Sequence, residues 1–240
     1  MGILNSKYGI IPACDVKNLN ELKQLVKNTC EFDFIQGYKI GINLVIIEGA
    51  KKTVEQIRDL TSLPIIYDHQ KYGNDIPEVS SGLFLDQIKA AGVDSIILFP
   101  FAGNETLKAT IEGCKRVGLF PIVGGEMTHK GFLESGGGYI SDAAPLRIYE
   151  DAAKLGVDTF VVPGTKVQQI KYYADRIRKI IPNPTFMFPG IGKGQGGDIA
   201  EAFEASLPSK CSAIIGRGIY AAKDINKAVS SLWKTASSVL

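Results

Sequence analysis

Short apolar runs recur along the chain, and longer amphipathic stretches separate them. The runs are nearly continuous in apolar residues rather than alternating, which is typical of parallel strands covered on both faces. The pattern predicts eight strands, at Gly9–Cys14, Phe34–Ile40, Pro64–Asp68, Ser95–Phe99, Leu119–Gly124, Thr159–Val162, Thr185–Phe188 and Ala213–Gly216.

The stretches between these runs have helical periodicity. Leu19–Val26 places its apolar residues at i, i+3, i+6 and i+7, which is one face of a helix. Ile76–Ala91 has a similar spacing and predicts a second helix. Two junctions, Lys89–Ile97 and Ala153–Val161, are nearly copies of each other, and each reads as a helix that ends at a left-handed glycine before a strand.

The repeat predicts the fold class. Eight units of about thirty residues account for the 240 residues, and eight strands alternating with helices at this length are typical of an α/β (β/α)8 TIM barrel. A doubly wound open sheet would normally carry a GxGxxG turn after its first strand, whereas this strand ends Pro12-Ala13-Cys14-Asp15. We therefore expect a single barrel domain over residues 1–240.

Composition narrows the choice of partners and compartment. The net charge is +2, from 27 Lys and Arg against 25 Asp and Glu, which argues against binding to nucleic acid or a membrane surface. The four cysteines form no CxxC pair, so we expect reduced thiols rather than a zinc cluster or a redox pair. No apolar run approaches the roughly 18 residues of a membrane span, and the N-terminus lacks a signal-peptide pattern. These features predict a cytoplasmic location.

Polar residues stand where the predicted strands end, which is where barrels of this type carry their chemistry. One such residue alone would read as a solvated loop charge, but their convergence on one rim predicts a site. The residues are Asp15, Lys39, Asp68, Lys71, Asp75, Thr128 and Arg217.

Two glycine-rich segments at the last two strands predict a phosphate site. Pro189–Asp198 holds five glycines in ten residues, and Gly216-Arg217-Gly218 ends the next strand. Glycine lets backbone N–H groups approach an anion, Arg217 can add a bidentate contact, and Gln195 offers an amide donor.

The charged residues of the rim allow two interpretations. Lys39, Asp68, Lys71, Asp75 and Asp15 could form a structural salt-bridge network, although buried charges are costly unless every member is paired. Alternatively, a cation beside carboxylates can stabilise a developing carbanion and then protonate it. At about 4 Å and an effective dielectric constant near 20, one such pair is worth roughly 4 kcal/mol.

From about residue 10 to residue 229 the sequence resembles the orotidine 5′-monophosphate decarboxylases, in their compact archaeal-type form. The motifs that carry the resemblance are Tyr67-Asp68-His69-Gln70-Lys71, Asp75-Ile76-Pro77-Glu78, Glu126-Met127-Thr128-His129, Pro189-Gly190-Ile191-Gly192, Gln195-Gly196-Gly197-Asp198 and Ile215-Gly216-Arg217-Gly218-Ile219-Tyr220.

The resemblance implies an enzyme without cofactor or metal that converts orotidine 5′-monophosphate (OMP) to uridine 5′-monophosphate (UMP) and CO2. It assigns Lys71 as the cation beside C6 and the proton donor to it, and Asp68 as the neighbour of the substrate carboxylate. Lys39 would bridge Asp68 and the ribose, and Asp15 would bind the ribose. Asp75 would complete the charged set from the neighbouring subunit, so the resemblance also implies a homodimer with shared active sites.

The remaining assignments concern the two ends of the nucleotide. The resemblance implies that Thr128 reads the edge of the pyrimidine. It also implies that four residues hold the phosphate: Gln195, Gly216, Arg217 and Gly218.

The sequence departs from the family pattern in two places. The common spacing is Asp-x-Lys-x-x-Asp, whereas here it is Asp68-x-x-Lys71-x-x-x-Asp75. Residues three apart on a strand do not share a face, so the backbone must bulge near His69-Gln70 for Lys71 to point inward. Val79 replaces a threonine that reaches the partner's ribose in many relatives, and either Ser80 substitutes for it or the contact is absent.

The residues by themselves are also compatible with other functions. A magnesium-dependent sugar-phosphate lyase of the same superfamily, of the 3-keto-gulonate 6-phosphate decarboxylase or hexulose-phosphate synthase type, would use a similar Asp and Lys set. A non-catalytic nucleotide-binding barrel is a further alternative. A metal-dependent epimerase would need two histidines as ligands, but alternation turns His69, one of only two, away from the site.

Overall fold

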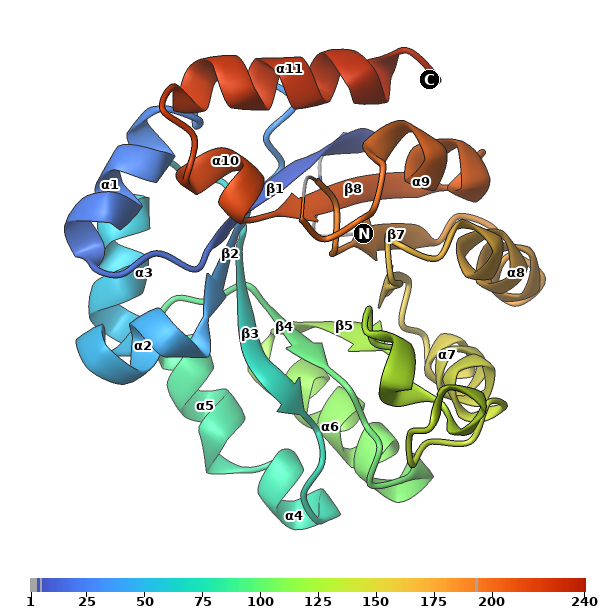
Figure 1. Cartoon of the computed structure of the whole chain (residues 1–240). Coiled ribbons are helices and arrows are strands. Elements are labelled where there is room, and N and C mark those ends of the chain that lie inside the picture. The colour runs from blue at the N-terminus through green and yellow to red at the C-terminus, as the bar shows by residue number, and fades with distance from the viewer. Residues whose placement is uncertain (1–3, 5, 193) are drawn as a thin grey trace.

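Eight parallel strands pair in sequence order, and β8 pairs with β1 to close a barrel (Figure 1). The computed structural model describes residues 4, 6–192 and 194–240, and of Gln70 and Lys71 it describes only the backbone. The strands are β1 (Tyr8–Cys14), β2 (Tyr38–Gly41), β3 (Ile65–Tyr72), β4 (Ser95–Leu98), β5 (Phe120–Gly124), β6 (Thr159–Val161), β7 (Thr185–Phe188) and β8 (Lys210–Ile215). The predicted (β/α)8 barrel is confirmed.

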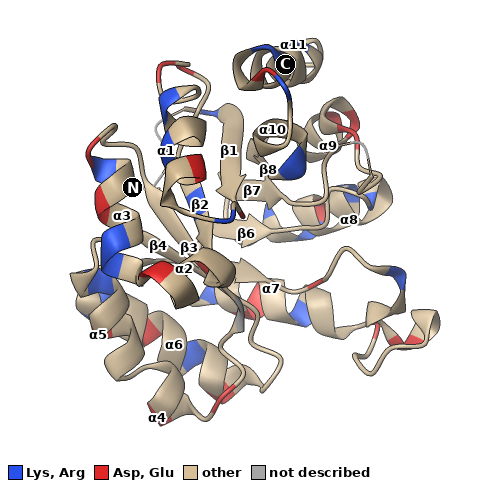
Figure 2. Cartoon of the chain, turned by 60° about the vertical axis from the view of Figure 1, so that its left-hand side comes forward, with Lys and Arg blue, Asp and Glu red and all other residues tan. Residues whose placement is uncertain are grey.

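The helices surround the barrel (Figure 1). In the described part of the chain, none is long and apolar enough to cross a membrane. Basic and acidic residues are interspersed over the visible helices (Figure 2). The helices are α1 (Leu19–Lys27), α2 (Ile42–Glu48), α3 (Ala50–Arg58), α4 (Pro77–Ser80), α5 (Leu83–Ala90), α6 (Asn104–Val117), η1 (Lys130–Phe132), η2 (Glu134–Gly136), α7 (Ala144–Lys154), α8 (Val167–Ile177), α9 (Ile199–Ser206), α10 (Arg217–Tyr220) and α11 (Ile225–Ser237).

Several predicted boundaries are wrong. Strand β3 continues to Tyr72 instead of ending at Asp68, and β8 begins at Lys210 instead of Ala213. The second strand begins at Tyr38 rather than Phe34, and Ile35 makes only an isolated bridge to Ile10. The predicted helix 76–91 is two helices, α4 and α5, because Gly82 has φ −91° and ψ −143° and interrupts the helical path. The left-handed glycines predicted after two helices are confirmed, with φ +91° at Gly92 and +87° at Gly156.

Apolar side chains fill the barrel interior and a second layer between the strands and the helices. The interior cluster includes Ile66, Ile122, Met187 and Ile214, each at most 5% exposed. A packed interior leaves no channel through the barrel, so polar chemistry is confined to the strand ends.

At Gly124 on β5, the packing of the barrel interior depends on the absence of a side chain. A Cβ built on Gly124 would lie 2.2 Å from Cε1 of Phe99, whose ring is 7% exposed. We expect Gly124→Ala to lower the free energy of unfolding by about 1–3 kcal/mol, because the ring must move in a packed core. Urea unfolding measures this change.

Gly131→Ala is the matched control. Gly131 has an ordinary φ of −83°, and a Cβ placed there would have its nearest neighbouring atom 3.7 Å away. A change within about 0.5 kcal/mol is expected there. Equal effects of the two substitutions would contradict the role given to Phe99.

Candidate active site

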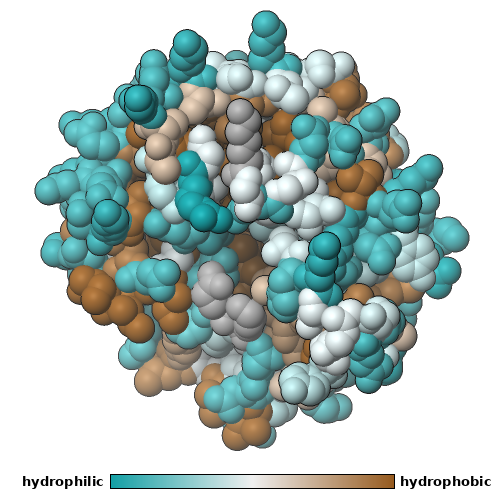
Figure 3. Space-filling model, in the orientation of Figure 1, coloured by the Kyte–Doolittle hydropathy of each residue, from teal (hydrophilic) through white to brown (hydrophobic). Residues whose placement is uncertain are grey.

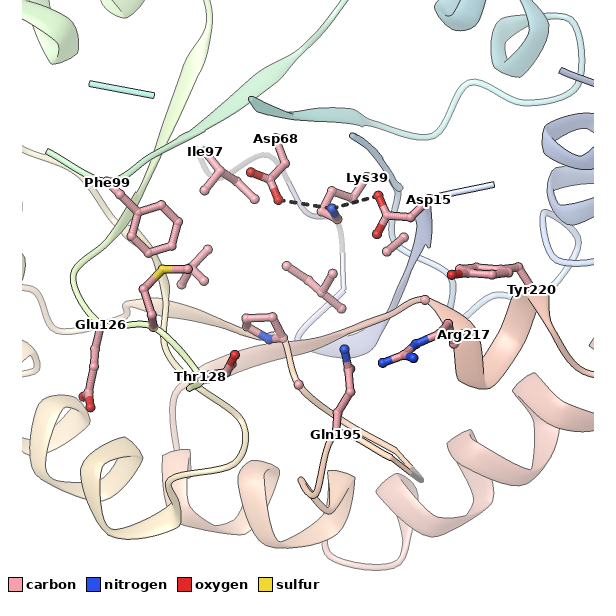
Figure 4. A pocket seen from close by; sticks show the side chains of 17 residues that line it. Asp15, Lys39, Asp68, Ile97, Phe99, Glu126, Thr128, Gln195, Arg217 and Tyr220 are labelled. Carbon is pink, nitrogen blue, oxygen red and sulfur yellow. Dashed lines mark hydrogen bonds and ion pairs between the residues drawn. The ribbon is translucent and has the colours of Figure 1, made fainter. Parts of the chain in front are cut away.

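A cavity of about 260 Å³ opens at the carboxyl ends of the strands. The face of the molecule drawn in Figure 3 is hollowed near its centre. The cavity is lined by the predicted residues Asp15, Lys39, Asp68, Thr128, Gln195, Gly216 and Arg217 (Figure 4). Parallel pairing therefore gathers these residues from β1, β2, β3, β5, β7 and β8 and from the loops that follow them.

Lys39 lies at the centre of the charged wall. Its Nζ is 3.1 Å from Oδ2 of Asp68 and 3.4 Å from Oδ1 of Asp15, and the residue is 5% exposed (Figure 4). Burial by itself would lower the pKa of Lys39, but the two carboxylates, Asp68 foremost, outweigh it and hold the pKa above its ordinary value. The site therefore keeps a fixed cation between two carboxylates.

Strand pairing brings these three residues together. Lys39 pairs with Ala13, and Gly41 pairs with Asp68. A Cβ on Gly41 would lie 2.5 Å from Oδ1 of Asp15, so the glycine leaves room for that carboxylate.

Strand β3 contains the irregularity that the sequence predicts. Asp68 pairs with Ile97 and Tyr72 with Leu98, so residues 69–71 have no counterpart on β4. This register shift is a β-bulge, and it confirms the predicted break next to His69. The backbone of Lys71 belongs to β3, but its side chain lies outside the described part of the structure. Its contact with the cavity stays a prediction.

The two histidines lie outside the cavity. His69 packs on the outer side of the barrel, with its ring centroid 4.9 Å from that of Phe84, and its Nδ1 is 2.6 Å from the hydroxyl of Tyr67. His129 is exposed, and its ring lies 5.8 Å from that of Phe132. Among the described residues, no cluster of three or more His, Cys, Asp or Glu could hold a metal ion.

The glycine-rich loop after β7 folds back on itself. The N–H of Gly197 donates to the carbonyl of Gly190 at 3.0 Å, and the N–H of Gly192 donates to the carbonyl of Gly197 at 2.9 Å. This loop brings the amide of Gln195 to the same end of the cavity as the Arg217 guanidinium (Figure 4).

The segment after β8 turns directly into α10. The N–H groups of Ile219 and Tyr220 donate to the carbonyl of Gly216, and Arg217 is the first residue of the helix. Gly218 lies in this turn but does not line the cavity, unlike the other predicted phosphate-binding residues.

Asp75 is exposed and does not line the cavity of its own chain. Its carboxylate accepts from the N–H of Ile76 at 2.7 Å, and its carbonyl accepts from the hydroxyl of Thr106 at 2.8 Å. Ser80 is 2% exposed, and its hydroxyl donates to the carbonyl of Asp75 at 3.3 Å. The Ser80 hydroxyl is therefore hydrogen-bonded within its own chain.

Comparisons with known proteins agree with this geometry. The model of the orotidine 5′-phosphate decarboxylase / HUMPS family matches residues 9–232. The chain belongs to this family.

Its relatives in the family match it over nearly their whole length. Orotidine 5′-phosphate decarboxylase of Methanosarcina mazei is 31% identical over 225 residues, which cover 93% of this chain and 92% of that protein. The Pyrococcus abyssi protein of the same name is 29% identical over 226 residues and covers 93% and 97% of the two chains.

Solved structures of the family share the fold. The Methanocaldococcus jannaschii orotidine 5′-monophosphate decarboxylase, complexed with the inhibitor BMP, superposes with a TM-score of 0.80 at 24% identity, covering 95% of this chain and 98% of that one. The Pyrococcus horikoshii enzyme gives a TM-score of 0.76 at 25% identity, with 95% and 99% covered.

Glu126 is a residue of the cavity wall to which the sequence assigned no role, although it stands in a motif of this family. Its side chain is 1% exposed, and it accepts from Nζ of Lys166 and from the hydroxyl of Tyr173, both at 2.6 Å. Burial, followed by this hydrogen bond, raises the pKa of Tyr173, so the phenol remains a donor. Glu126 could have been predicted from the sequence, because it is an isolated carboxylate just after an apolar strand.

His69 gives a pH-dependent prediction. Burial lowers the pKa of His69 from 6.5, against an opposing effect of Asp68. The unfolded chain therefore binds a proton at a higher pH than the folded chain, and stability falls as the pH drops below 6.5. We expect His69→Phe to lose less stability than the wild type between about pH 7 and pH 5, because only the wild type carries this titration. Urea unfolding at both pH values tests it, and the same loss in both proteins would contradict it.

Proposed function

We propose that this chain is an orotidine 5′-monophosphate decarboxylase, which converts OMP to UMP and CO2 without a cofactor or metal. The observation that carries the proposal is the cavity, in which a charged row of Asp15, Lys39 and Asp68 faces the Gln195 and Arg217 pair (Figure 4). Two relatives that match more than nine-tenths of the chain are named orotidine 5′-phosphate decarboxylases, which supports the proposal. We propose that residues 1–240 act as one catalytic domain in the cytoplasm.

The nucleotide would lie across the cavity. Arg217 and Gln195 bind the phosphate with a charge-assisted contact and an amide donor, and the backbone at Gly216 allows the anion to come close. Asp15 and Lys39 bind the ribose hydroxyls at the opposite wall. The hydroxyl of Thr128 hydrogen-bonds to the edge of the pyrimidine.

The reaction occurs at C6 of the pyrimidine. The bond from C6 to the carboxylate breaks, its electron pair stays on C6, and CO2 leaves. The ammonium of Lys71 stabilises this pair and then donates the proton that forms the new C6–H bond. Asp68 lies beside the substrate carboxylate, and Lys39 holds Asp68 in place.

The apolar part of the cavity strengthens these charge effects. Ile97, Phe99 and Val161 line the same cavity as the charged row, and each is at most 7% exposed. A wall of this kind lowers the local dielectric constant, so an ammonium stabilises a carbanion more strongly there than in water.

A second copy of the chain would complete the site. Exposed apolar side chains follow Asp75 along the chain, with Ile76 at 60%, Val79 at 52% and Leu83 at 71%. Ile46 and Ile47 on α2 are 73% and 76% exposed. Brown surface lies over α2 and α4 at the lower left and bottom of Figure 3. Exposed apolar surface of this kind is typical of protein interfaces. We propose that it forms a homodimer contact that carries Asp75 to the partner's cavity.

A direct assay tests the function. The ultraviolet absorbance of OMP should fall when the purified protein is added, at the same rate with and without a chelator. Turnover that needs magnesium would favour the sugar-phosphate lyase alternative. UMP binding without any fall in absorbance would favour the non-catalytic alternative.

Replacement of Lys71 tests the chemistry. We expect Lys71→Ala to lower kcat by about 10³-fold or more, because no other group donates the proton to C6. UMP affinity should change by less than about tenfold, since the phosphate is bound elsewhere. Lys51→Ala, at an exposed lysine of α3, is the control that should leave both quantities unchanged. Normal turnover by Lys71→Ala would refute the mechanism.

Mixing two inactive variants tests the shared site. Asp75→Asn and Lys71→Ala chains are combined in equal amounts and allowed to exchange, so that about half of the dimers are mixed. One of the two cavities in each mixed dimer then has both groups intact, so the sample should regain about a quarter of the wild-type activity. If Asp75 acts within its own chain, no cavity in the mixture is complete. Each variant taken alone through the same exchange is the control.

A further inference from the structure

Four rings, three from β3 and one from α5, pack together on the outer face of β3 around the bulge. We call Tyr67, His69, Tyr72 and Phe84 the ring cluster. The centroid of His69 is 5.5 Å from that of Tyr67, 4.9 Å from Phe84 and 6.0 Å from Tyr72, and Tyr72 lies 4.7 Å from Phe84. Phe84 belongs to α5, so the cluster joins both ends of the bulge to one helix.

The cluster reveals where the strand changes its alternation. Successive side chains of a regular strand point to opposite faces, so residues three apart lie on different faces. His69 and Tyr72 are three apart, yet both rings lie on the outer face against Phe84. The alternation is therefore reversed once between them, within the bulge.

This reversal bears on position 71. Counted forward from His69, regular alternation would place position 71 on the outer face. Counted back from Tyr72, regular alternation would instead place position 71 on the face of Asp68, which lines the cavity. An Asp-x-Lys spacing needs no reversal, because residues two apart share a face. The longer Asp68-x-x-Lys71 spacing of this chain does need one.

Polar contacts fix the rings at both ends of the bulge. The Tyr67 hydroxyl is 2.6 Å from Nδ1 of His69, and the Tyr72 hydroxyl donates to the carbonyl of Ser80 in α4 at 2.7 Å. The backbone of Tyr72 accepts from the N–H of Phe99 at 2.7 Å, which restores pairing with the next strand. Burial, with Asp68 next, raises the pKa of Tyr67 to about 12, so its phenol keeps the proton.

We propose that the ring cluster is a positioning device that reverses the alternation of β3, with His69 as its central positioning residue, so that position 71 faces the cavity. This proposal rests on the proposed function, which assigns the proton transfer to Lys71. It gives His69 a role that involves no contact with the substrate.

Kinetics with a matched set of variants tests the proposal. His69→Ala removes the ring and should lower kcat by about tenfold or more, with UMP affinity changed by less than about threefold, because the phosphate and ribose contacts lie on other strands. Tyr67→Phe keeps the ring and removes one hydroxyl, so it should lower kcat by a smaller factor, at least about twofold, with UMP affinity unchanged.

The control is a ring of the same outer layer far from the bulge. Tyr8 is the first residue of β1, and its ring centroid lies 6.4 Å from that of Phe203. Tyr8→Ala should therefore lower the free energy of unfolding without lowering kcat. A merely structural role for His69 would make His69→Ala behave like Tyr8→Ala, and this result would overturn the proposal. If His69→Ala does not fold, Tyr67→Phe decides, and an unchanged kcat overturns the proposal.

A second readout is independent of catalysis. In a Lys71→Cys variant, UMP should protect the new thiol from alkylation by iodoacetamide, measured at residue 71 by mass spectrometry. Adding His69→Ala should abolish most of this protection. Protection without any decarboxylation by the wild type would refute the proposed function and leave the positioning role standing. Decarboxylation with equal protection in both backgrounds would refute the positioning role alone.

Discussion

The site depends on one buried ammonium held between two carboxylates. Lys39 has two anionic partners, Asp15 at the end of β1 and Asp68 on β3, and removal of both carboxylates would leave its buried ammonium without compensation. Breaking a buried pair in this way typically costs about 3–5 kcal/mol. The register of β1, β2 and β3 is therefore tied to the charge balance of the cavity, and a fixed cation is present before any substrate binds.

The barrel separates two tasks that would otherwise interfere. The charged row comes from the first three strands, whereas Gln195 and Arg217 come from the loops after β7 and β8. A phosphate bound at one wall can thus contribute binding energy while its charge stays away from the reacting carbon. Glu126 lines the same cavity, and its carboxylate is held by Lys166 and Tyr173.

Strand alternation allows the face of a side chain to be predicted from its position in the sequence, and the bulge in β3 departs from this rule. His69 and Tyr72 share a face although they are three residues apart. An additional residue in a catalytic strand would ordinarily turn every later side chain to the wrong face. Here aromatic packing on the outside of the barrel compensates for a change of spacing on the inside.

The sequence by itself determined what local patterns encode: the eight-fold repeat, the left-handed glycines at 92 and 156, and the polar residues at the strand ends that line the cavity. Only the tertiary structure decided the start of β2 at Tyr38, the division of residues 76–91 into two helices, and the outward position of Asp75. It alone gave Glu126 its partners, which lie 40 and 47 residues away. Periodicity and turn chemistry act over a few neighbours, whereas these features depend on contacts between distant segments that exist only once the barrel has closed.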